Sequence, residues 1–242
     1  MDYAVQSYRG RNWTVKSSSR RLSVVEIISQ RRAAASTARG RATRDRVVAA
    51  AAELVHEGGV ERTTLDDVRA AAGVSKSQLY HYFTDKADLV RAVVARQGEV
   101  VLAAQQPELD AIDSFAGLLR WRDKVIALQE EHGCTLGCPL GSLVADLADY
   151  DELGRLALVS AFAAWEGRLR DGLAAMRDHG DLTESADLDT LASGLLSATQ
   201  GGLLLAQTTR SVRPLRVALD TALDRVRAGL AVPTPQNVRL EA

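Results

Sequence analysis

Residues 76–82 form a short run of hydrogen-bonding and aromatic side chains between two turn signals. The run reads KSQLYHY, and every residue in it except Leu79 carries a polar group. Side chains of these types can bond base edges in a DNA groove, and lysine and tyrosine can also bond phosphate oxygens. The run therefore predicts a surface that contacts nucleic acid, made of Lys76, Ser77, Gln78, Tyr80, His81 and Tyr82.

Two of these side chains also have a purely structural interpretation. Gln78 stands three residues after Ser75, which is the spacing of a helix capping box, so its amide can bond the backbone instead of a base. Tyr80 can pack as a half-buried ring of the core. Both alternatives stay open at the level of sequence. Phe83, which follows the run, is expected to lie entirely in the core.

A second chemically distinctive segment contains His132, Cys134 and Cys138. Cys138 precedes Pro139, a residue that favours the first turn of a helix, so its thiol is expected at a helix N-terminus with a lowered pKa. Such a thiol, with Cys134 four residues earlier, is suited to redox or electrophile sensing. The alternative is that both cysteines are small buried residues. The segment lacks a fourth ligand and a zinc-type spacing, so no metal site is expected.

The polar run needs a helix to present it, and the residues before it predict a tight pair of helices. A first helix over 43–57 ends at a pair of glycines. A second helix opens at Thr64, stops at Gly73, and is followed by a third that opens at Ser75. Because only Val74 separates the stop from the next cap, the two short helices must cross steeply. This geometry predicts a helix-turn-helix whose third helix is held out toward a DNA groove.

A fourth helix is expected to start after Thr84, whose hydroxyl would cap it, with Asp85 and Asp88 in its first turn. Lys86 is a cation in that same turn, where the helix dipole disfavours it. A phosphate group at this helix N-terminus would remove the conflict. Lys86 is therefore a further candidate for contact with the DNA backbone.

Charge is distributed unevenly along the chain. The 242 residues have a formal net charge of −1, which excludes a protein that coats nucleic acid by bulk charge. Residues 1–40 carry eight Lys and Arg against two Asp and Glu, whereas residues 98–242 carry 13 against 21. An anionic partner is therefore expected for the N-terminal part alone. Residues 1–40 are expected to form a basic, disordered arm, with an organellar presequence as the alternative.

Several classes of protein are disfavoured by what the sequence lacks. No apolar run approaches the roughly 20 residues of a membrane span, and the two cysteines and the missing secretory h-region predict a cytoplasmic protein with no membrane partner. No set of acid, base and nucleophile is found, and no cofactor is expected, so an enzyme housed in the helical part is the weak alternative. An architectural DNA binder is disfavoured by the acidic C-terminal part.

The stretch TTLDDVRAAAGVSKSQLYHYFTDKADLVRAVV, residues 63–94, resembles the DNA-binding domain of TetR-family regulators, and the similarity extends back to about Ala42. The AGVS turn, the Leu-Tyr-His-Tyr-Phe block and the lysine after it stand at the spacings of that family. The resemblance implies that Thr64 bonds a phosphate and that the third helix faces the major groove. It also implies that Tyr82 and Lys86 grip the DNA backbone.

The same resemblance implies an all-α fold with two functional parts. A helix-turn-helix domain at 41–88 would bind DNA, a helical bundle at 89–232 would bind ligand and dimerise, and a flexible tail would follow at 233–242. The protein would be a repressor that binds a palindromic operator as a homodimer and is released by a small, largely apolar effector. Residues 132–153, HGCTLGCPLGSLVADLADYDEL, further resemble the LmrA/YxaF-type subgroup, whose members answer to antibiotics or flavonoids.

Small residues interrupt the apolar pattern between positions 188 and 205 at helical spacing. Glycine inside a helix costs about 1 kcal/mol relative to alanine, so such a flat stripe is expected to be compensated by another helix that approaches closely. The next segment supplies an apolar stripe for this contact. The predicted dimer interface consists of Gly194, Ala198, Gly201, Leu215, Leu219 and Leu223. The alternative is that both stripes belong to the core of one subunit.

Ligand sites in helical bundles are apolar cavities with a few oriented polar groups. Aromatic residues make up only 5% of the chain, so those on the expected core faces are the main candidates to line a cavity. The predicted ligand contacts are Phe115, Leu118, Trp121, Cys138, Phe162, Trp165 and Gln200. The alternative for each of them is an ordinary place in the core.

Overall fold

A computed structural model describes residues 37–149 and 151–231 of the chain, and the regular structure of this part is helical. A single isolated antiparallel bridge joins Leu182 to Leu230. The helices are α2 Ala38–Arg62, α3 Leu65–Ala72, α4 Lys76–Tyr82, α5 Lys86–Ala104, α6 Phe115–Glu131, α7 Pro139–Leu147, α8 Glu152–Asp178, α9 Leu188–Thr209 and α10 Arg213–Arg227. None of these helices is long and apolar enough to cross a membrane. The predicted all-α fold is confirmed.

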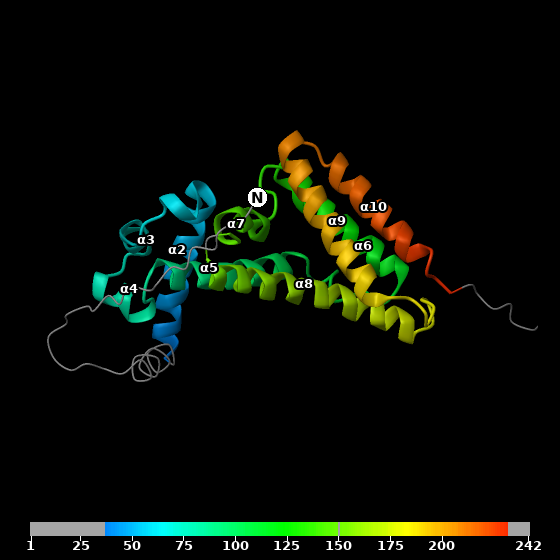
Figure 1. The fold of residues 1–242 in the computed structure, drawn as a ribbon, viewed down its shortest axis with the longest axis horizontal. Helices are drawn as coiled ribbons and strands as arrows, with labels where there is room; N and C mark the ends of the chain where they lie inside the picture. The colour runs from blue at the N-terminus through cyan, green and yellow to red at the C-terminus, as the bar shows by residue number, and fades with distance from the viewer. Residues whose placement is uncertain (1–36, 150, 232–242) are drawn as a thin grey trace, which may run out of the picture.

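The helices form two bodies that are joined by long helices (Figure 1). One end holds α2, α3 and α4, and the other holds α6, α9 and α10. Helix α5 leaves the first end and packs along α8, which in turn packs against α9. Helix α7 lies between the two ends and contacts α2, α5 and α8. This short helix therefore touches both bodies.

Two capping boxes hold the tight turn between α3 and α4. The Thr64 hydroxyl accepts from the Asp67 amide at 3.1 Å, and Asp67 accepts from the Thr64 amide at 3.1 Å. Ser75 and Gln78 repeat the pattern at 3.1 Å and 2.8 Å. Gly73 between the boxes has φ 62°, a left-handed conformation that glycine adopts without steric cost. The predicted helix-turn-helix is confirmed in its caps and in its turn.

Three helix boundaries differ from their predicted positions. Helix α2 begins at Ala38 with Thr37 as its cap, inside the stretch predicted as a disordered arm. Residues 1–36 and 232–242, where most of the arm and the whole tail were predicted, lie outside the described residues. Gly59 breaks the helical backbone with φ 79°, but one more turn follows it. Asp85 caps α5 in place of Thr84, because the Thr84 amide and hydroxyl bond Asp88 instead.

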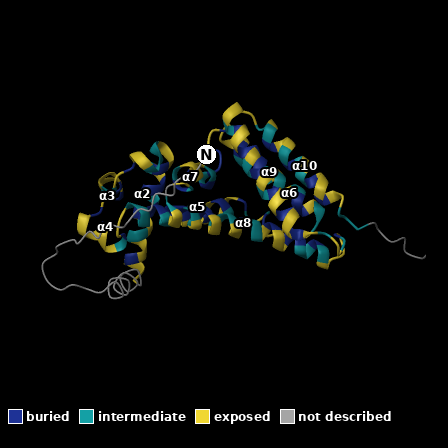
Figure 2. Ribbon diagram, viewed as in Figure 1, coloured by how far each residue is buried: buried dark blue, intermediate teal, exposed yellow. Residues whose placement is uncertain are grey.

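One continuous hydrophobic core runs through both bodies (Figure 2). Near α4 it contains Leu79 and Phe83, and Phe83 was predicted to lie there. On α6 and α8 it contains Trp121, Trp165 and Leu169. Each large side chain that is fully buried stabilises the fold by about 1.5–3 kcal/mol relative to its exposed state. Burial of Leu79 and Phe83 fixes which side of α4 faces inward, so the polar side must face solvent.

Helix α10 is held from two sides within the subunit. Its leucines Leu215, Leu219 and Leu223 are fully buried, and a side chain added at Gly202 of α9 would lie 2.8 Å from the Leu215 Cα atom. The three leucines were predicted to form the dimer interface, and this part of the prediction is wrong. The close approach that the glycine permits is made inside one subunit, because α9 and α10 pack against each other there.

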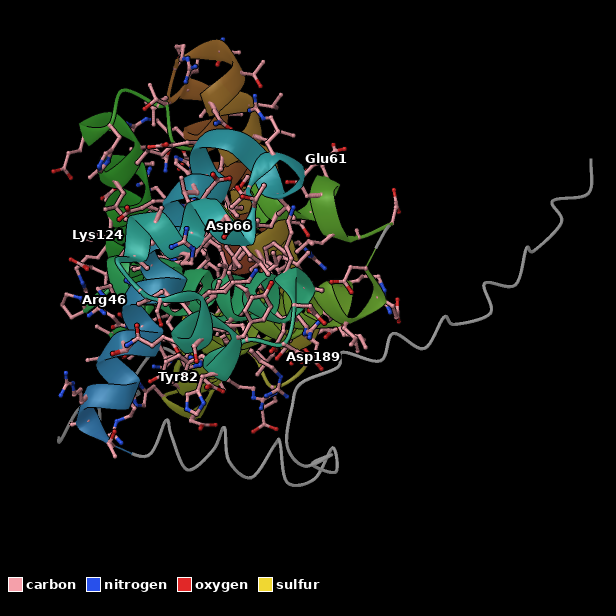
Figure 3. The ribbon with its side chains drawn as sticks, turned by 90° about the vertical axis from the view of Figure 1, so that its left-hand side faces the viewer. Arg46, Glu61, Asp66, Tyr82, Lys124 and Asp189 are labelled. Atoms are coloured by element: carbon pink, nitrogen blue, oxygen red, sulfur yellow. The ribbon has the colours of Figure 1, made fainter. Side chains whose placement is uncertain are left out.

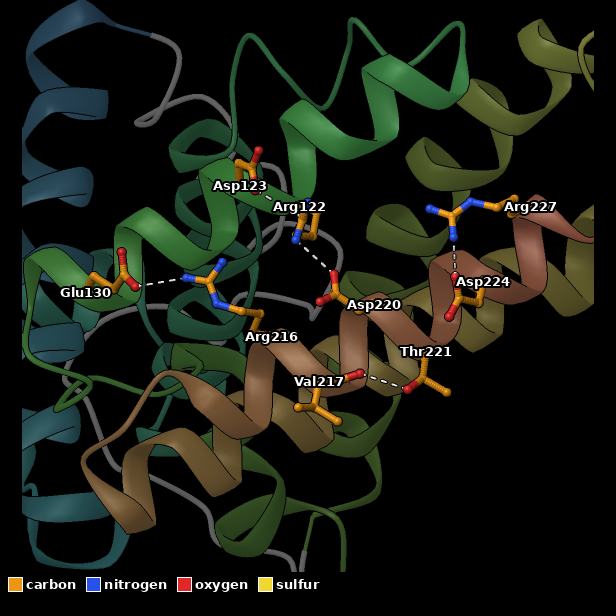
Figure 4. A network of polar contacts seen from close by, with 9 residues as sticks. All are labelled: Arg122, Asp123, Glu130, Arg216, Val217, Asp220, Thr221, Asp224 and Arg227. Carbon is orange, nitrogen blue, oxygen red and sulfur yellow. Dashed lines mark hydrogen bonds and ion pairs between the residues drawn. The ribbon is translucent and has the colours of Figure 1, made fainter.

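Ion pairs join α10 to α6 on another side (Figure 4). Arg122 of α6 lies 2.8 Å from Asp220, and Arg216 lies 3.1 Å from Glu130. These pairs are partly exposed, and such pairs contribute only about 0–1 kcal/mol each. Their effect is mainly to set the rotation of α10. That rotation leaves Val217 and Thr221 on the side away from the core.

Candidate nucleic-acid interface and internal cavities

Helix α4 presents its polar residues to solvent. Lys76, Ser77, Gln78, Tyr80 and His81 are all exposed, and the Tyr82 ring is half-buried. Tyr80 is 44% exposed, which excludes the alternative that its ring belongs to the core. The Lys76 ammonium lies 6.0 Å from the centre of the Tyr80 ring, and the His81 and Tyr82 rings meet edge to face at 5.1 Å. The helix thus offers a cation, amide, hydroxyl and ring groups on one surface.

The capping boxes occupy part of the predicted contact set. Gln78 uses its side-chain oxygen to accept from Ser75, as the structural alternative expected, and this leaves its amide group to donate. The Thr64 hydroxyl donates to Asp67 at 2.6 Å. These bonds hold the pKa of the Asp67 carboxyl below its ordinary value. A phosphate contact by Thr64 requires that the hydroxyl leave this carboxylate, so that role stays a prediction.

Lys86 has a partner that the sequence did not reveal. Its ammonium donates to the Glu61 carbonyl at 3.0 Å. That carbonyl lies at the end of α2, where the helix dipole places partial negative charge. The cation in the first turn of α5 is therefore stabilised by a neighbouring helix terminus, and a phosphate is not needed to explain it. The contact of Lys86 with DNA stays a prediction.

Two arginines of α2 that were not predicted as contacts lie next to α4. The Arg44 guanidinium stands 5.4 Å from the centre of the Phe83 ring, immediately after α4. Arg46 donates to the Ala72 carbonyl at 3.0 Å, at the turn before α4. Figure 3 looks onto this end of the molecule and labels Arg46 and Tyr82. The sequence shows these arginines as local basic residues, but only the packing of α2 places their charge beside α4.

Two cavities, both partly open to solvent, adjoin α8, and Cys138 lines both of them. The first measures ≈ 420 Å³ and lies between α7, α8 and α9. The second measures ≈ 290 Å³ and lies between α5, α6, α8 and the loop before α7. The first is lined by Cys138, Gly141, Ser142, Val144, Phe162, Gln200, Gly201, Leu204 and Gln207. The second is lined by Val100, Val101, Ala104, Gln105, Val125, Leu128, Gln129, His132, Leu136, Gly137, Cys138, Pro139, Trp165 and Leu203.

Four of the predicted ligand contacts line these cavities: Cys138, Phe162, Trp165 and Gln200. The other three are placed elsewhere, which corrects their assignment. Phe115 stacks under the Arg227 guanidinium at 4.8 Å, and Leu118 is fully buried in the core. Trp121 is buried and donates to the Gln105 side chain at 2.8 Å. The physical reason is that the later turns of α6, and not its first turns, border the second cavity.

The second cavity also has polar lining residues that sequence reasoning missed. Gln105 and Gln129 are buried polar side chains, and His132 stands one turn after Gln129. A signal for the α6 contribution exists in the sequence, because Val125, Leu128, Gln129 and His132 follow helical spacing. That spacing shows a shared helix face, but it does not show that the face borders a cavity.

Cys138 does not have the lowered pKa that was predicted for it. The residue is the N-cap of α7, but its side chain makes no capping hydrogen bond. Burial raises the pKa of the Cys138 thiol, and the nearby Gly141 backbone and Gln200 side chain offset only part of this effect. Cys134 is also buried, and both cysteines are free. The thiol therefore lies in the apolar interior and not at an open helix terminus, which disfavours the reactive thiolate.

Helix α9 has an outward face made of small and apolar residues. Gly194 and Gly201 have no atom within 4 Å of a side chain added to them. Leu204 and Leu205 are 64% and 53% exposed, and Ala198 between the glycines is half-buried. On the neighbouring α10, Val217 is exposed as well. This surface, residues 194, 198, 201, 204 and 205 with Val217, is called the α9 face below.

Comparison with known proteins links both bodies to one class. A model of the bacterial regulatory proteins of the tetR family matches residues 47–93, and a model of the tetracyclin repressor-like C-terminal domain matches residues 116–222. The transcriptional regulator AcuR of Cereibacter sphaeroides is 28% identical over 173 residues, which cover 70% of this chain and 78% of AcuR.

Two further proteins show similarity over most of their length. An uncharacterised HTH-type transcriptional regulator from the lacX 3' region of Lactococcus lactis subsp. lactis is 25% identical over 185 residues, covering 74% of this chain and 91% of that protein. The crystal structure of SmeT, the repressor of the Stenotrophomonas maltophilia multidrug efflux pump SmeDEF, is 25% identical with a TM-score of 0.55, covering 78% and 91%. The matched proteins are transcriptional regulators and not enzymes.

Proposed function

We infer that this chain, a member of the tetR family of bacterial regulatory proteins, is a repressor that binds a palindromic operator as a homodimer and leaves it when an effector binds. Its helix-turn-helix and its family make it a DNA-binding transcriptional regulator. The observation that carries the proposal is the exposed polar face of α4, held by two capping boxes on a buried Leu79. The roles of individual residues and the release by effector are the proposed part.

Contact with DNA is divided between two kinds of group in this proposal. Lys76, Ser77, Gln78, Tyr80 and His81 face the base edges of the major groove. Tyr82, Lys86 and Thr64 contact the phosphates, and the positive charge of the early turns of α2 adds attraction without sequence preference. A net charge of −1 over the whole chain is compatible with this, because the early turns of α2 carry a local group of cations, Arg39, Arg41, Arg44 and Arg46.

The homodimer is proposed to form through the α9 face. Exposed leucines beside two open glycines let a second copy of the same surface approach closely, and their burial would stabilise the pair. Gly194, Ala198 and Gly201 keep their predicted place in the interface, while exposed Leu204 and Val217 replace the buried leucines of α10. In such dimers the two recognition helices stand about 34 Å apart, one turn of DNA.

Helix α7 offers a path from the cavities to the DNA-binding end. Its early residues Gly141, Ser142 and Val144 line the first cavity. Near its other end, the Asp146 carboxylate accepts from the Val60 amide at 2.8 Å, just after the kink of α2. Thr64, the cap of α3, follows four residues later. An effector that shifts α7 would therefore move the segment that leads into the helix-turn-helix.

The effector is proposed to be small and largely apolar, because apolar residues dominate the walls of both cavities. The resemblance of residues 132–153 to the LmrA/YxaF-type subgroup stays a prediction, since the matched C-terminal model describes the domain in general terms. A DNA-binding domain at 41–88, a regulatory domain at 89–232 and a place in the cytoplasm are part of the same proposal.

A salt-titrated binding assay tests the function. We expect the full chain to bind the DNA upstream of its own gene far more tightly than random DNA, with two subunits per site. The affinity for both DNAs should fall as salt rises, because phosphate contacts release counterions. Equal affinity for the two DNAs would make the protein a non-specific binder and would remove the operator from the proposal.

A further inference from the structure

Two of the residues that line the second cavity each carry a buried polar atom with no hydrogen-bond partner within the described part of the chain. These atoms are the indole nitrogen of Trp165 and the side-chain oxygen of Gln129. Trp165 is 2% exposed and Gln129 is 8% exposed, so bulk water does not compensate either side chain. A buried polar group left without a partner costs about 1–3 kcal/mol. Unpaired groups of this kind need a partner, and a molecule bound in the adjoining cavity can supply one.

The third buried polar side chain of the same wall serves as a contrast. Gln105 donates to the Val101 carbonyl at 2.8 Å and accepts from the Trp121 indole at 2.8 Å, so both ends of its amide are satisfied by the protein. The fold therefore satisfies the hydrogen-bonding groups of Gln105, but not the Trp165 indole nitrogen or the Gln129 side-chain oxygen. Among the buried amide and indole groups of these lining residues, one donor and one acceptor remain without a partner in the described part of the chain.

The orientation of the Gln129 amide follows from its surroundings. Its nitrogen donates to the Gly137 carbonyl at 3.4 Å, a long but correctly paired contact. Reversing the amide would bring its oxygen toward that carbonyl oxygen, and two acceptors would repel each other. The oxygen is therefore the atom left without a partner. It can accept a hydrogen bond, whereas the Trp165 indole can only donate one.

Within the part of the chain that the structure describes, the wall contains no permanently charged side chain to balance a charged ligand. Its members are mainly aliphatic, among them Val100, Ala104 and Leu203, and no Lys, Arg, Asp or Glu lines the cavity. The titratable lining residues are His132, whose ring nitrogen bonds the Leu128 carbonyl, and Cys138, whose pKa is raised by burial. Moving a charged group into such a cavity without a counter-charge is strongly unfavourable. The occupant must therefore be uncharged.

We propose that the second cavity binds a compact, uncharged molecule with an apolar body that carries a hydrogen-bond acceptor beside an N–H or O–H donor, as a carboxamide does. The acceptor of the ligand takes the Trp165 indole proton, and its donor reaches the Gln129 oxygen. At ≈ 290 Å³ the cavity is at the small end of ligand sites, about 300–1,000 Å³. The inference rests on the proposed function in one respect, that this ligand is the effector.

Matched probes that share one ring test the ligand class. Cyclohexanecarboxamide offers both groups, its methyl ester counterpart offers only the acceptor, and cyclohexanecarboxylate and cyclohexylammonium carry charge. We expect titration calorimetry on the full chain to rank the amide first and the ester second. Each charged probe should bind at least about tenfold more weakly than the amide, which corresponds to ~1.4 kcal/mol.

Three variants assign the two hydrogen bonds. Trp165→Phe removes the indole donor while keeping a ring in place, and it should weaken amide binding about tenfold, or ~1.4 kcal/mol. Gln129→Met removes the acceptor, so the amide should lose its advantage over the ester. Gln200→Met changes a polar residue that lines only the first cavity, and it should leave amide affinity unchanged. Circular dichroism and sedimentation confirm that each variant is folded.

The outcomes separate this inference from the proposed function. Absence of binding by all probes, equal binding of a charged probe, or an unchanged amide affinity in Trp165→Phe would each overturn the ligand assignment. Operator binding is measured without any probe, so it stands or fails independently. If the amide binds as expected but does not weaken operator binding, the ligand class is supported and the effector role of this cavity is lost.

Discussion

The α4 face and the wall of the second cavity are both built from polar side chains on helices, but they satisfy these side chains differently. On α4 the polar groups are exposed, and their protein bonds run between residues three apart, as from Ser75 to Gln78. At the cavity, the Gln129 side-chain oxygen and the Trp165 indole nitrogen are buried, and neither has a hydrogen-bond partner in the described part of the chain. In the absence of DNA, water forms hydrogen bonds with the exposed groups of α4. Bulk water does not reach the two buried atoms beside the cavity, so their hydrogen-bonding types suggest which groups a ligand should offer.

Substitutions in the two regions should change different properties of the protein. Replacing an exposed residue of α4 other than Gln78, which belongs to the capping box, removes a contact with DNA and leaves the packing of Leu79 intact, so stability should hardly change. Replacing a cavity residue alters the interior as well as the ligand. The experiments below test whether the two regions differ in this way, and how they are joined.

The largest loss of operator affinity is expected from a substitution on the α9 face. The proposed dimer forms there, and it presents two copies of α4 to the operator. Leu204→Asp places a carboxylate on the proposed interface, where burial without a partner is strongly unfavourable. We expect a folded monomer in sedimentation experiments, with operator affinity reduced by orders of magnitude because one half-site is lost. Leu153→Asp on α8 is the matched control, since Leu153 is 57% exposed and lies off the α9 face. If Leu153→Asp is a monomer and Leu204→Asp remains a dimer, the interface lies on α8 and not on the α9 face.

The link between the two regions is tested at Asp146. Asp146→Ala removes the bond to the Val60 amide. We expect the variant to bind cyclohexanecarboxamide and the operator as the parent does, but the amide should no longer weaken operator binding. Asp149→Ala, two residues beyond α7 and exposed, serves as the control and should respond normally. A normal response from Asp146→Ala would show that the signal reaches α4 through another contact, such as the packing of α5 on α8.

Within the α4 region, base contacts and phosphate contacts should separate. Lys76→Ala is expected to relax the preference at particular operator bases by about 1–3 kcal/mol for a lost bidentate contact. Lys86→Ala should weaken binding to specific and random DNA alike, with a smaller salt slope. Binding to a set of single-base operator variants measures both. If Lys86→Ala changes neither affinity nor slope, the bond to the Glu61 carbonyl is the whole role of that lysine.

The two sides of α9 should respond in opposite directions to a single methyl group. Gly202→Ala would bring a Cβ atom within 2.8 Å of the Leu215 Cα atom, so overpacking should destabilise the fold by about 1–3 kcal/mol. Gly194→Ala meets open space and should stabilise the helix by up to about 1 kcal/mol. Urea unfolding of both variants measures the difference. Destabilisation by Gly194→Ala would contradict the open face.

The smallest effect is expected at the first capping box. Hydrogen bonds from Thr64 lower the pKa of Asp67 in the folded state. The ionised carboxylate therefore stabilises the fold above its unfolded-state pKa, and this contribution is lost as pH falls through the lower folded-state pKa. We expect Asp67→Asn to unfold more easily than the parent at neutral pH, and the difference should shrink below about pH 4. A difference that is constant across this range would contradict the ionised cap.

Local patterns in the sequence were sufficient for the helix-turn-helix, because its caps and its glycine turn depend on residues that are neighbours along the chain. Ser75, Gln78 and Gly73 were predicted correctly for this reason. The positions of Lys86 and Arg46 were not predictable in the same way. Their partners, Glu61 and Ala72, lie 25 and 26 residues away and were brought close only by the packing of α2.

The sequence by itself determined that the chain is helical, where the DNA-binding turn lies, and which helix faces are apolar. It did not determine what each apolar face packs against, since a face that needs burial is served equally by the same subunit, by a second subunit or by a ligand. Tertiary packing made that choice: it buried Leu215 inside the subunit, left Leu204 outside, and placed the buried side chains of Trp165 and Gln129 beside a cavity. The apolar periodicity of a helix shows which face must be buried, whereas only the arrangement of the helices in space shows what covers that face.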